Sequence, residues 1–277
     1  MGHMGQGTEG PQPLPGIRCI VAVGSGKGGV GKTTVAVNLS IALAKMGNRV
    51  GLLDADVYGP NVPLMMGSRE QPRVLEGNRI EPLQAHGVKL ISVGSISPGD
   101  KPMVMRGPML HQIIRQFLQQ VQWGELDFLI VDLPPGTGDV VISLVQTVPL
   151  TGAVVISTPS DVALQDGRKA IEMFRQVNVD VLGIVENMSS FTCPHCHHEI
   201  DIFSKGGVER TAREYQVPFL GTVALDPEIR HGGDRGLPIS LAGDLSEQAA
   251  PFYKIARQVA ERAQEHASKE TNILEIR

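Results

Sequence analysis

A glycine-rich segment at residues 26–33, Gly-Lys-Gly-Gly-Val-Gly-Lys-Thr, sets narrow limits on the fold of this 277-residue chain. It matches the pattern G-x-x-x-x-G-K-[ST], follows an apolar run at 17–23 and precedes a helical pattern at 33–46. Glycines let backbone N–H groups converge on phosphates, and the positive end of the helix adds to the attraction. In such a loop Lys32 reaches the β- and γ-phosphates and the Thr33 hydroxyl ligates Mg²⁺. The alternative is a glycine-rich turn with an incidental lysine, which the flanking strand and helix disfavour.

Short apolar strands alternate with amphipathic helices along the rest of the chain. The strand-like runs are residues 17–23, 49–53, 128–131, 153–157, 181–185 and 219–223, and the helical patterns are residues 33–46, 108–121, 162–177, 207–215 and 245–267. This alternation predicts an α/β fold with a mostly parallel central sheet and helices on both faces. Residues 77–97 have the pattern of a small β insertion.

We expect a single folded domain at residues 17–267. Residues 1–4 look like a cloning scar, and the glycines and prolines that follow them up to residue 16 indicate a flexible lead-in. Residues 268–277 are expected to form a frayed tail.

Composition excludes several classes of function. The 25 Lys and Arg against 29 Asp and Glu give a net charge of −4, which argues against a broad nucleic-acid surface. No run of about 18 apolar residues is present, so we expect no membrane partner. Three cysteines cannot build a disulfide framework for a chain of this size, and the polar start lacks a signal segment. We therefore expect a cytoplasmic protein.

Carboxylates follow two of the predicted strands. Asp132 ends the strand at 128–131, where a Walker-B aspartate holds the Mg²⁺ shell. Asp54 and Asp56 follow the strand at 49–53; Asp56 is the candidate for orienting the attacking water, and Asp54 for the water shell of the metal. The alternative is that either one caps a following helix. After Asp132, a loop with glycines at 136 and 138 offers a backbone N–H to the γ-phosphate.

Lys27 is a second lysine at the start of the phosphate loop. The segment at 27–33 resembles the deviant Walker A motif of the MinD and nitrogenase iron-protein class of P-loop NTPases. In that class the first lysine reaches across a dimer interface to the nucleotide of the partner. The resemblance implies catalytic roles for Lys27 and Lys32, with Asp56 beside them. A solvated surface lysine is the alternative for Lys27.

Further motifs narrow the resemblance to one family. They are Asp-Ala-Asp-Val-Tyr-Gly-Pro-Asn at 54–61, Asp-Leu-Pro-Pro-Gly-Thr-Gly-Asp at 132–139, Glu-Asn-Met-Ser at 186–189 and Cys-Pro-His-Cys at 193–196. Together they resemble the Mrp/ApbC family of iron–sulfur cluster carriers over about residues 17–262. The resemblance implies an ATPase homodimer that binds a 4Fe–4S cluster and passes it to apo iron–sulfur proteins. Many bacterial members carry a small extra N-terminal domain that does not precede residue 17 here, so we expect a truncated or short form.

The same resemblance implies a set of nucleotide contacts. Asn187 would contact adenine through its amide, and Asp226 and Pro227 would flank the base. Capping of its own loop is the alternative for Asn187. The residues expected to bind the phosphates are Gly26, Gly28, Gly29, Val30, Gly31, Lys32, Thr33 and Thr34.

Cys193 and Cys196 form a metal-binding pair in a polar loop. Two thiolates at this spacing can hold one metal centre, and a cubane cluster takes four, so two chains related by a two-fold axis would supply the set. Cys19 lies within the first strand and is expected to be a small buried apolar residue. Three alternatives remain open at this point: a zinc site within one chain that adds one or both of His197 and His198, a redox disulfide, and a plain turn.

Two other functions compete with an iron–sulfur carrier. A partitioning or positioning ATPase, with a structural zinc at the cysteine loop, would need a membrane-binding tail or a basic surface. The short mixed-charge segment at 270–277 and the net charge of −4 supply neither. A small-molecule kinase would have no use for Lys27 or for the cysteine pair.

Overall fold

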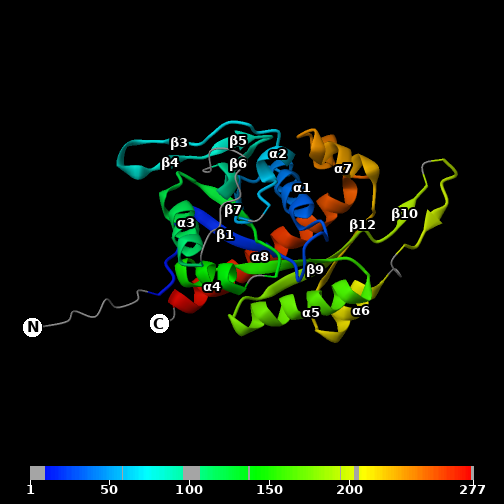
Figure 1. Cartoon of the computed structure of the whole chain (residues 1–277). Coiled ribbons are helices and arrows are strands. Elements are labelled where there is room, and N and C mark those ends of the chain that lie inside the picture. The colour runs from blue at the N-terminus through cyan, green and yellow to red at the C-terminus, as the bar shows by residue number, and fades with distance from the viewer. Residues whose placement is uncertain are drawn as a thin grey trace, which may run out of the picture.

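The chain folds around one eight-stranded sheet, as a computed structural model shows (Figure 1). The structure describes residues 10–57, 59–95, 107–136, 138–193, 195–202 and 206–275. The sheet order is β12-β9-β8-β1-β7-β2-β6-β5, and all pairs are parallel except β5 with β6. The strands are β1 (Ile17–Gly24), β2 (Val50–Asp54), β5 (Leu83–Ala85), β6 (Val88–Ser92), β7 (Leu126–Asp132), β8 (Gly152–Ser157), β9 (Val181–Asn187) and β12 (Phe219–Val223). The predicted α/β fold is thereby confirmed.

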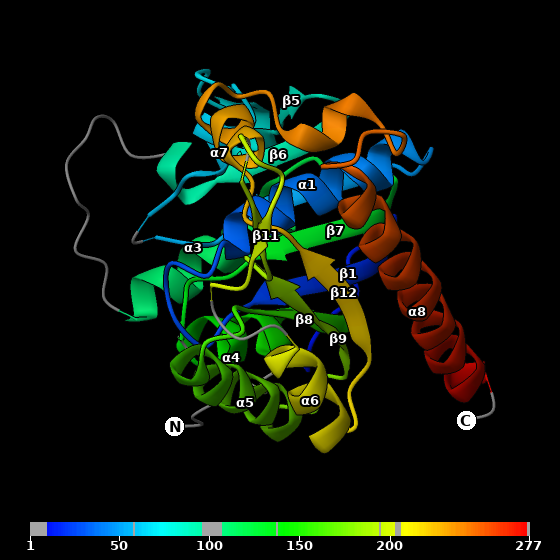
Figure 2. The same ribbon diagram turned by 90° about the vertical axis from the view of Figure 1, so that its right-hand side faces the viewer.

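Helices cover both faces of the sheet (Figure 2). One face packs against α1 and α8, and the other against α3, α4, α5 and α6. Strand β1 shows the alternation, since Val21 and Val23 enter the first core and Ile20 and Ala22 the second. The helices are α1 (Lys32–Lys45), α2 (Val62–Met65), α3 (Gly107–Gln120), α4 (Gly138–Thr147), α5 (Asp161–Gln176), α6 (Gly207–Glu214), α7 (Pro227–Asp234) and α8 (Ala250–Glu275).

Three expectations about elements were wrong. Residues 77–97 contain strands, as expected, but they are not a separate insertion: only Ile80 and Glu81 pair outside the main sheet, whereas β6 pairs in parallel with β2 inside it and β5 adds its antiparallel edge. The last helix begins at Ala250 and not at Leu245, which is 98% exposed. It also runs through the expected tail to Glu275. The expected scar at residues 1–4 lies outside the described residues.

Two small ribbons leave the body of the molecule. One pairs β3 (Arg73–Val74) with β4 (Ile80–Glu81), and the other pairs β10 (Phe191–Thr192) with β11 (Glu199–Ile200). The second projects from the body of the molecule beyond the end of β9, at the right of Figure 1. Within the described chain, no helix combines the length and the apolar character that crossing a membrane requires.

Candidate nucleotide site and cysteine hairpin

Glycines give the phosphate loop its shape between β1 and α1. Gly29 and Gly31 have φ of 79° and 81°, a region that side chains disfavour. At Gly26 a Cβ atom would lie 1.9 Å from the backbone oxygen of Asp166 on α5, so only glycine fits. The loop is therefore fixed partly by its own backbone conformation and partly by its packing against α5.

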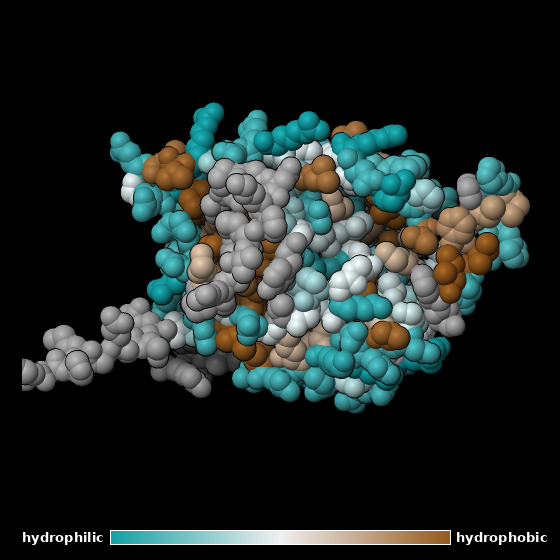
Figure 3. Space-filling model, viewed as in Figure 1, coloured by the Kyte–Doolittle hydropathy of each residue, from teal (hydrophilic) through white to brown (hydrophobic). Residues whose placement is uncertain are grey.

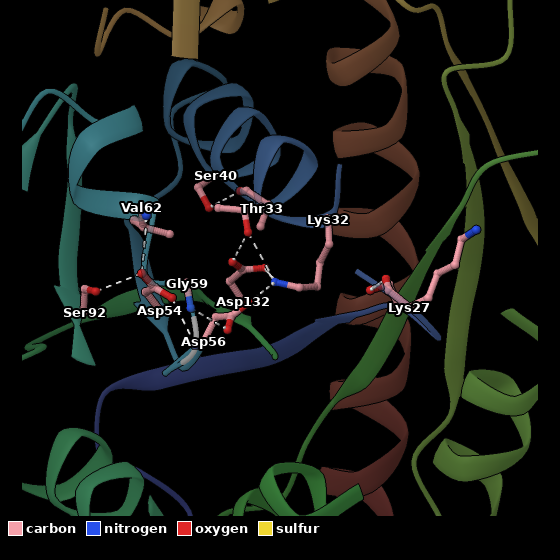
Figure 4. Close-up of polar contacts among 12 residues, drawn as sticks. Lys27, Lys32, Thr33, Ser40, Asp54, Asp56, Gly59, Val62, Ser92 and Asp132 are labelled. Carbon is pink, nitrogen blue, oxygen red and sulfur yellow. Dashed lines mark hydrogen bonds and ion pairs between the residues drawn. The ribbon is translucent and has the colours of Figure 1, made fainter. Parts of the chain in front are cut away.

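The two functional side chains of the loop turn inward to the end of β7 (Figure 4). The Lys32 Nζ lies 2.6 Å from Asp132 Oδ1 and 3.6 Å from Asp56 Oδ2. The Thr33 hydroxyl donates a hydrogen bond to Asp132 Oδ2 at 2.7 Å. Lys32 is 6% exposed and Asp132 is fully buried. The structure thus brings together four predicted residues, with the ammonium group of Lys32 between two aspartates.

Burial controls the protonation of the two deepest carboxyl groups. The pKa of Asp54 is raised to about 7, chiefly because burial removes water and also because the charge of Asp132 is near, while a hydrogen bond from Ser92 opposes the shift. Burial also raises the pKa of Asp132, against the opposing attraction of Lys32. Each of these carboxyl groups therefore resists carrying a charge unless a cation or donor faces it.

Asp54 holds the chain between β2 and α2. Its carboxylate accepts hydrogen bonds from Ser92 Oγ at 2.8 Å, from the Asp56 N–H at 3.1 Å and from the Val62 N–H at 3.3 Å. It is fully buried and does not line the nucleotide pocket described below. Because Val62 is the first residue of α2, the geometry favours the helix-capping alternative over a place in the metal's water shell.

A pocket of about 700 Å³ opens over the phosphate loop. Several expected residues line it, namely Lys27, Gly28, Gly29, Gly31, Lys32, Thr33, Thr34, Asp56, Asn187 and Asp226. Gly26, Val30, Asp132 and Pro227 are not among the lining residues. The side chain of Lys27 points away from the Lys32–Asp132 cluster (Figure 4).

The far wall of the pocket comes from α2 and α7, which the sequence patterns missed. Leu64 and Met65 of α2 and Ile229 and Arg230 of α7 are among the residues that line it. Asp226 accepts a hydrogen bond from the Glu228 N–H at 2.7 Å and so caps α7, with Pro227 as the first helical residue. This Asp-Pro pair is a helix-start signal that would have predicted α7.

Asn187 is tied to the phosphate loop. Its Nδ2 donates a hydrogen bond to the Val30 carbonyl oxygen at 2.8 Å. A Cβ atom on Gly31 would lie 2.1 Å from the same nitrogen, so this contact also requires glycine at 31. One N–H of the amide that was expected to contact adenine therefore holds the loop, and Asn187 also lines the pocket.

The loop after β7 is closed by a similar bond. The Gly136 N–H, considered above for the γ-phosphate, donates to the Ser25 carbonyl oxygen at 3.1 Å. Gly138 is the first residue of α4, and Thr137 lies outside the described residues.

The oxygen donors fit a magnesium nucleotide. The Thr33 hydroxyl and the Asp132 carboxylate are the hard ligands that Mg²⁺ prefers, and they already lie 2.7 Å apart. Next to them, the glycines of residues 28–31 leave the loop open to the pocket.

The cysteine pair lies at the tip of the ribbon formed by β10 and β11. The Cys193 N–H donates to the His198 carbonyl oxygen at 3.0 Å, and the His197 N–H donates to the Cys193 carbonyl oxygen at 2.9 Å. Cys193 is half-buried and Cys196 is exposed. Hydrogen bonds from the Cys196 N–H, then from the His195 N–H, lower the pKa of the Cys193 thiol.

The residues that the structure describes do not assemble a zinc site around this pair. Within residues 10–275, apart from the gaps given above, no three His, Cys, Asp or Glu side chains form a group that could hold a metal ion. His197 and His198 are exposed. Cys19 is buried in β1, as expected. Two apolar residues, Ile200 and Ile202, are exposed beside the cysteines, and brown side chains gather on this projecting segment in Figure 3.

The class of the protein follows from the central strands. The phosphate loop leads from β1 into α1, and the neighbouring β7 supplies Asp132, which is the arrangement of a P-loop NTPase. A family model described as "ParA: NUBPL iron-transfer P-loop NTPase" matches residues 16–260, and the chain belongs to this family. The resemblance to iron–sulfur carriers that the motifs predicted is confirmed at the level of the family.

Individual proteins agree with this assignment. The chain is 53% identical over 249 residues to an iron–sulfur cluster carrier protein of Deinococcus radiodurans, covering 89% of this chain and 70% of the relative. A nucleotide-binding protein of Archaeoglobus fulgidus, solved with ADP, is 38% identical with a TM-score of 0.71, covering 80% of this chain and 88% of that one. MinD of Pyrococcus horikoshii, a septum site-determining protein solved with Mg-ADP, is 26% identical with a TM-score of 0.63, covering 87% and 95%.

Proposed function

We propose that this protein is an ATP-hydrolysing iron–sulfur cluster carrier, which binds a 4Fe–4S cluster between two copies of the chain and passes it to apoproteins in the cytoplasm. The observation that carries the proposal is the placement of the cysteine ribbon. Met188 lines the nucleotide pocket, and Cys193 follows it five residues later on a projecting segment. A metal-binding pair and a nucleotide site thus share one stretch of chain, in a family described as iron-transfer NTPases.

The nucleotide part of the proposal assigns roles to the phosphate loop and to the side chains next to it. Bound Mg-ATP supplies the phosphoanhydride bond that is broken. The loop amides and Lys32 bind its phosphates, while Thr33 and Asp132 hold the magnesium ion. Asp56 lines the pocket and accepts a proton from the attacking water, which it also orients.

The dimer part of the proposal concerns Lys27. Among the described residues no ion pair of Lys27 is found, and its side chain extends away from the loop's own cluster (Figure 4). A lysine in this position is free to meet a phosphate held by a second copy, where it would neutralise charge in the transition state. Each chain would then complete the site of its partner.

The cluster part of the proposal follows from the number of thiolates. One chain supplies two suitably spaced cysteines, while a cubane cluster takes four. Two ribbons facing each other across a two-fold axis supply the set, and the exposed position of Cys196 leaves the cargo accessible to an acceptor.

Anaerobic reconstitution with iron and sulfide tests this proposal. We expect about four irons per dimer and a broad charge-transfer absorption band, both lost in Cys193→Ser and in Cys196→Ser. Cys19→Ala is the matched control and should keep the cluster, because Cys19 is buried in β1 far along the chain from the ribbon. Protein that binds one zinc per monomer through Cys193 and Cys196, yet never assembles iron and sulfide, would refute the carrier function.

A further inference from the structure

Both ends of the cysteine ribbon are held at the end of β9. On the return side, the buried Glu186 carboxylate accepts hydrogen bonds from the Gly206 N–H at 3.3 Å and from the Val208 N–H at 3.1 Å. These bonds also cap the start of α6. The chain thus leaves β9 after Asn187, and at Gly206 it is hydrogen-bonded again to the end of the same strand.

The outgoing side is joined to the wall of the nucleotide pocket. The Ser189 N–H donates to the Val223 carbonyl oxygen at 3.0 Å, and the Leu225 N–H donates to the Ser190 carbonyl oxygen at 2.8 Å. Leu225 lines the pocket. Between β9 and these bonds, Met188 has a φ of 55°, so the chain turns sharply at this point.

Asn187 connects this base of the ribbon to the phosphate loop. Its bond to the Val30 carbonyl oxygen spans 157 residues of sequence and is buried. The Val30–Gly31 peptide is planar and trans, so a fixed Val30 oxygen also fixes the direction of the Gly31 N–H. If this peptide reorients when phosphates bind, the Asn187 side chain must therefore move with it, or the hydrogen bond must break. Asn187 is also the residue at which the chain leaves β9 toward Cys193.

We propose that the hydrogen bond between Asn187 and Val30 couples the phosphate loop to the position of the cysteine ribbon. Asn187 is then a positioning residue: it acts on Cys193 and Cys196 through the chain that follows it. The coupling is reciprocal by thermodynamic necessity, so a change at the ribbon also alters nucleotide affinity. The inference rests on the proposed function, because it takes the loop as the nucleotide site and the ribbon as the cluster site.

Hydrogen–deuterium exchange on the metal-free protein tests the coupling without any cluster. The amides of Ser189 and Leu225 report on the base of the ribbon, and the amides of residues 191–193 and 195–202 report on the ribbon itself. Adding Mg²⁺ and a non-hydrolysable ATP analogue should change their exchange about fivefold or more. In Asn187→Ala, with the analogue at a saturating concentration, this change should vanish.

Asn38→Ala is the matched control. Asn38 is also a buried asparagine anchored beside the loop, with its Nδ2 donating to the Thr34 carbonyl oxygen at 2.9 Å. Its Oδ1 accepts from the Ser240 N–H at 2.9 Å, so it ties α1 to the segment at 239–242 and not to β9. The nucleotide-dependent change at the ribbon should persist in this variant.

The possible outcomes separate the inference from the function on which it rests. Wild-type protein that fails to bind the analogue overturns the proposed function together with the inference. Wild-type protein that binds it with no change at the ribbon overturns the coupling alone. The coupling also falls if the change persists in Asn187→Ala, as it would if dimer formation shielded the ribbon directly.

A measurement without nucleotide covers the case in which Asn187→Ala binds the analogue too weakly. Loss of the bond to Val30 should release the base of the ribbon, so Ser189 and Leu225 should exchange faster than in the wild type. Exchange of both amides at the wild-type rate would show that Asn187 does not hold the base, and the coupling would be refuted.

Discussion

Replacing Lys32 by methionine should destabilise the nucleotide-free protein, and the loss should grow with pH. Methionine keeps the apolar stem of the side chain and removes only the charge. The wild-type ammonium lies 2.6 Å from Asp132 Oδ1, and neither group is more than 6% exposed. The substitution therefore leaves a buried carboxylate that has lost its cation.

The expected loss in the free energy of unfolding is about 3–5 kcal/mol at pH 8. Coulomb's law gives an attraction of roughly 6 kcal/mol at this separation with an effective dielectric constant of about 20, and the desolvation of the ammonium offsets part of it. Without Lys32, burial raises the folded-state pKa of Asp132 further above its unfolded value. The native state then binds more protons than the unfolded state between these two values, so stability falls as pH rises through that window. The wild type already has such a slope, since the pKa of Asp54 is raised to about 7.

Urea unfolding of the wild type and variants at pH 5.5 and pH 8 measures this effect. The double variant Lys32→Met/Asp132→Asn should recover most of the stability at pH 8, because no uncompensated charge remains. Lys45→Met makes the same chemical change at the exposed end of α1 and should cost less than about 1 kcal/mol. An equal loss at both pH values, or a double variant no more stable than Lys32→Met, would show that the buried pair does not control this site.

Three further predictions concern the loop and its water. Asp56→Asn should bind ATP but release phosphate about 100-fold more slowly, because the water loses its proton acceptor; turnover at the wild-type rate would remove Asp56 from the mechanism. Lys27→Ala should spare nucleotide binding and lower hydrolysis, and mixed dimers with a Lys32→Ala chain should differ in activity from the average of the two pools; strict additivity in proven mixed dimers would exclude action across the interface. Gly31→Ala and Gly29→Ala should each lower the free energy of unfolding by about 1–2 kcal/mol because of their positive φ. Only Gly31→Ala should also displace the Asn187 amide and weaken nucleotide binding, as titration would measure.

The sheet could be predicted because its strands are buried on both faces. A strand in a covered parallel sheet reads as a nearly continuous apolar run, so residues 19–23 and 153–156 stand out from the polar and glycine-containing segments around them. The position of β6 within the sheet could not be predicted from the sequence in this way. Its pattern over 88–92 indicates a strand but carries no information about its partner, and only tertiary packing places it beside β2.

The pocket walls were missed because their helices have weak patterns. Helix α2 is a single turn, too short for a helical period to appear. Helix α7 contains Gly232 and Gly233, which lower its helical propensity, and Met65 of α2 packs close to the second of them. Their common signal is the residue before each helix, and at α7 the Asp226-Pro227 start was present in the sequence.

The inward position of Lys32 could not be predicted from the motif, and it has a consequence for how ligands bind. The motif assigns Lys32 to phosphates and Thr33 and Asp132 to magnesium, whereas in the structure all three satisfy one another. If Lys32 left Asp132 for a phosphate alone, the buried carboxylate would lose its cation, at the cost argued above for Lys32→Met. A magnesium ion bound at Asp132 and Thr33 replaces that charge. Magnesium binding and the movement of Lys32 to a phosphate therefore favour each other. Nucleotide and magnesium should therefore bind with positive coupling, and ATP affinity measured in a chelator should fall well below its value in excess Mg²⁺.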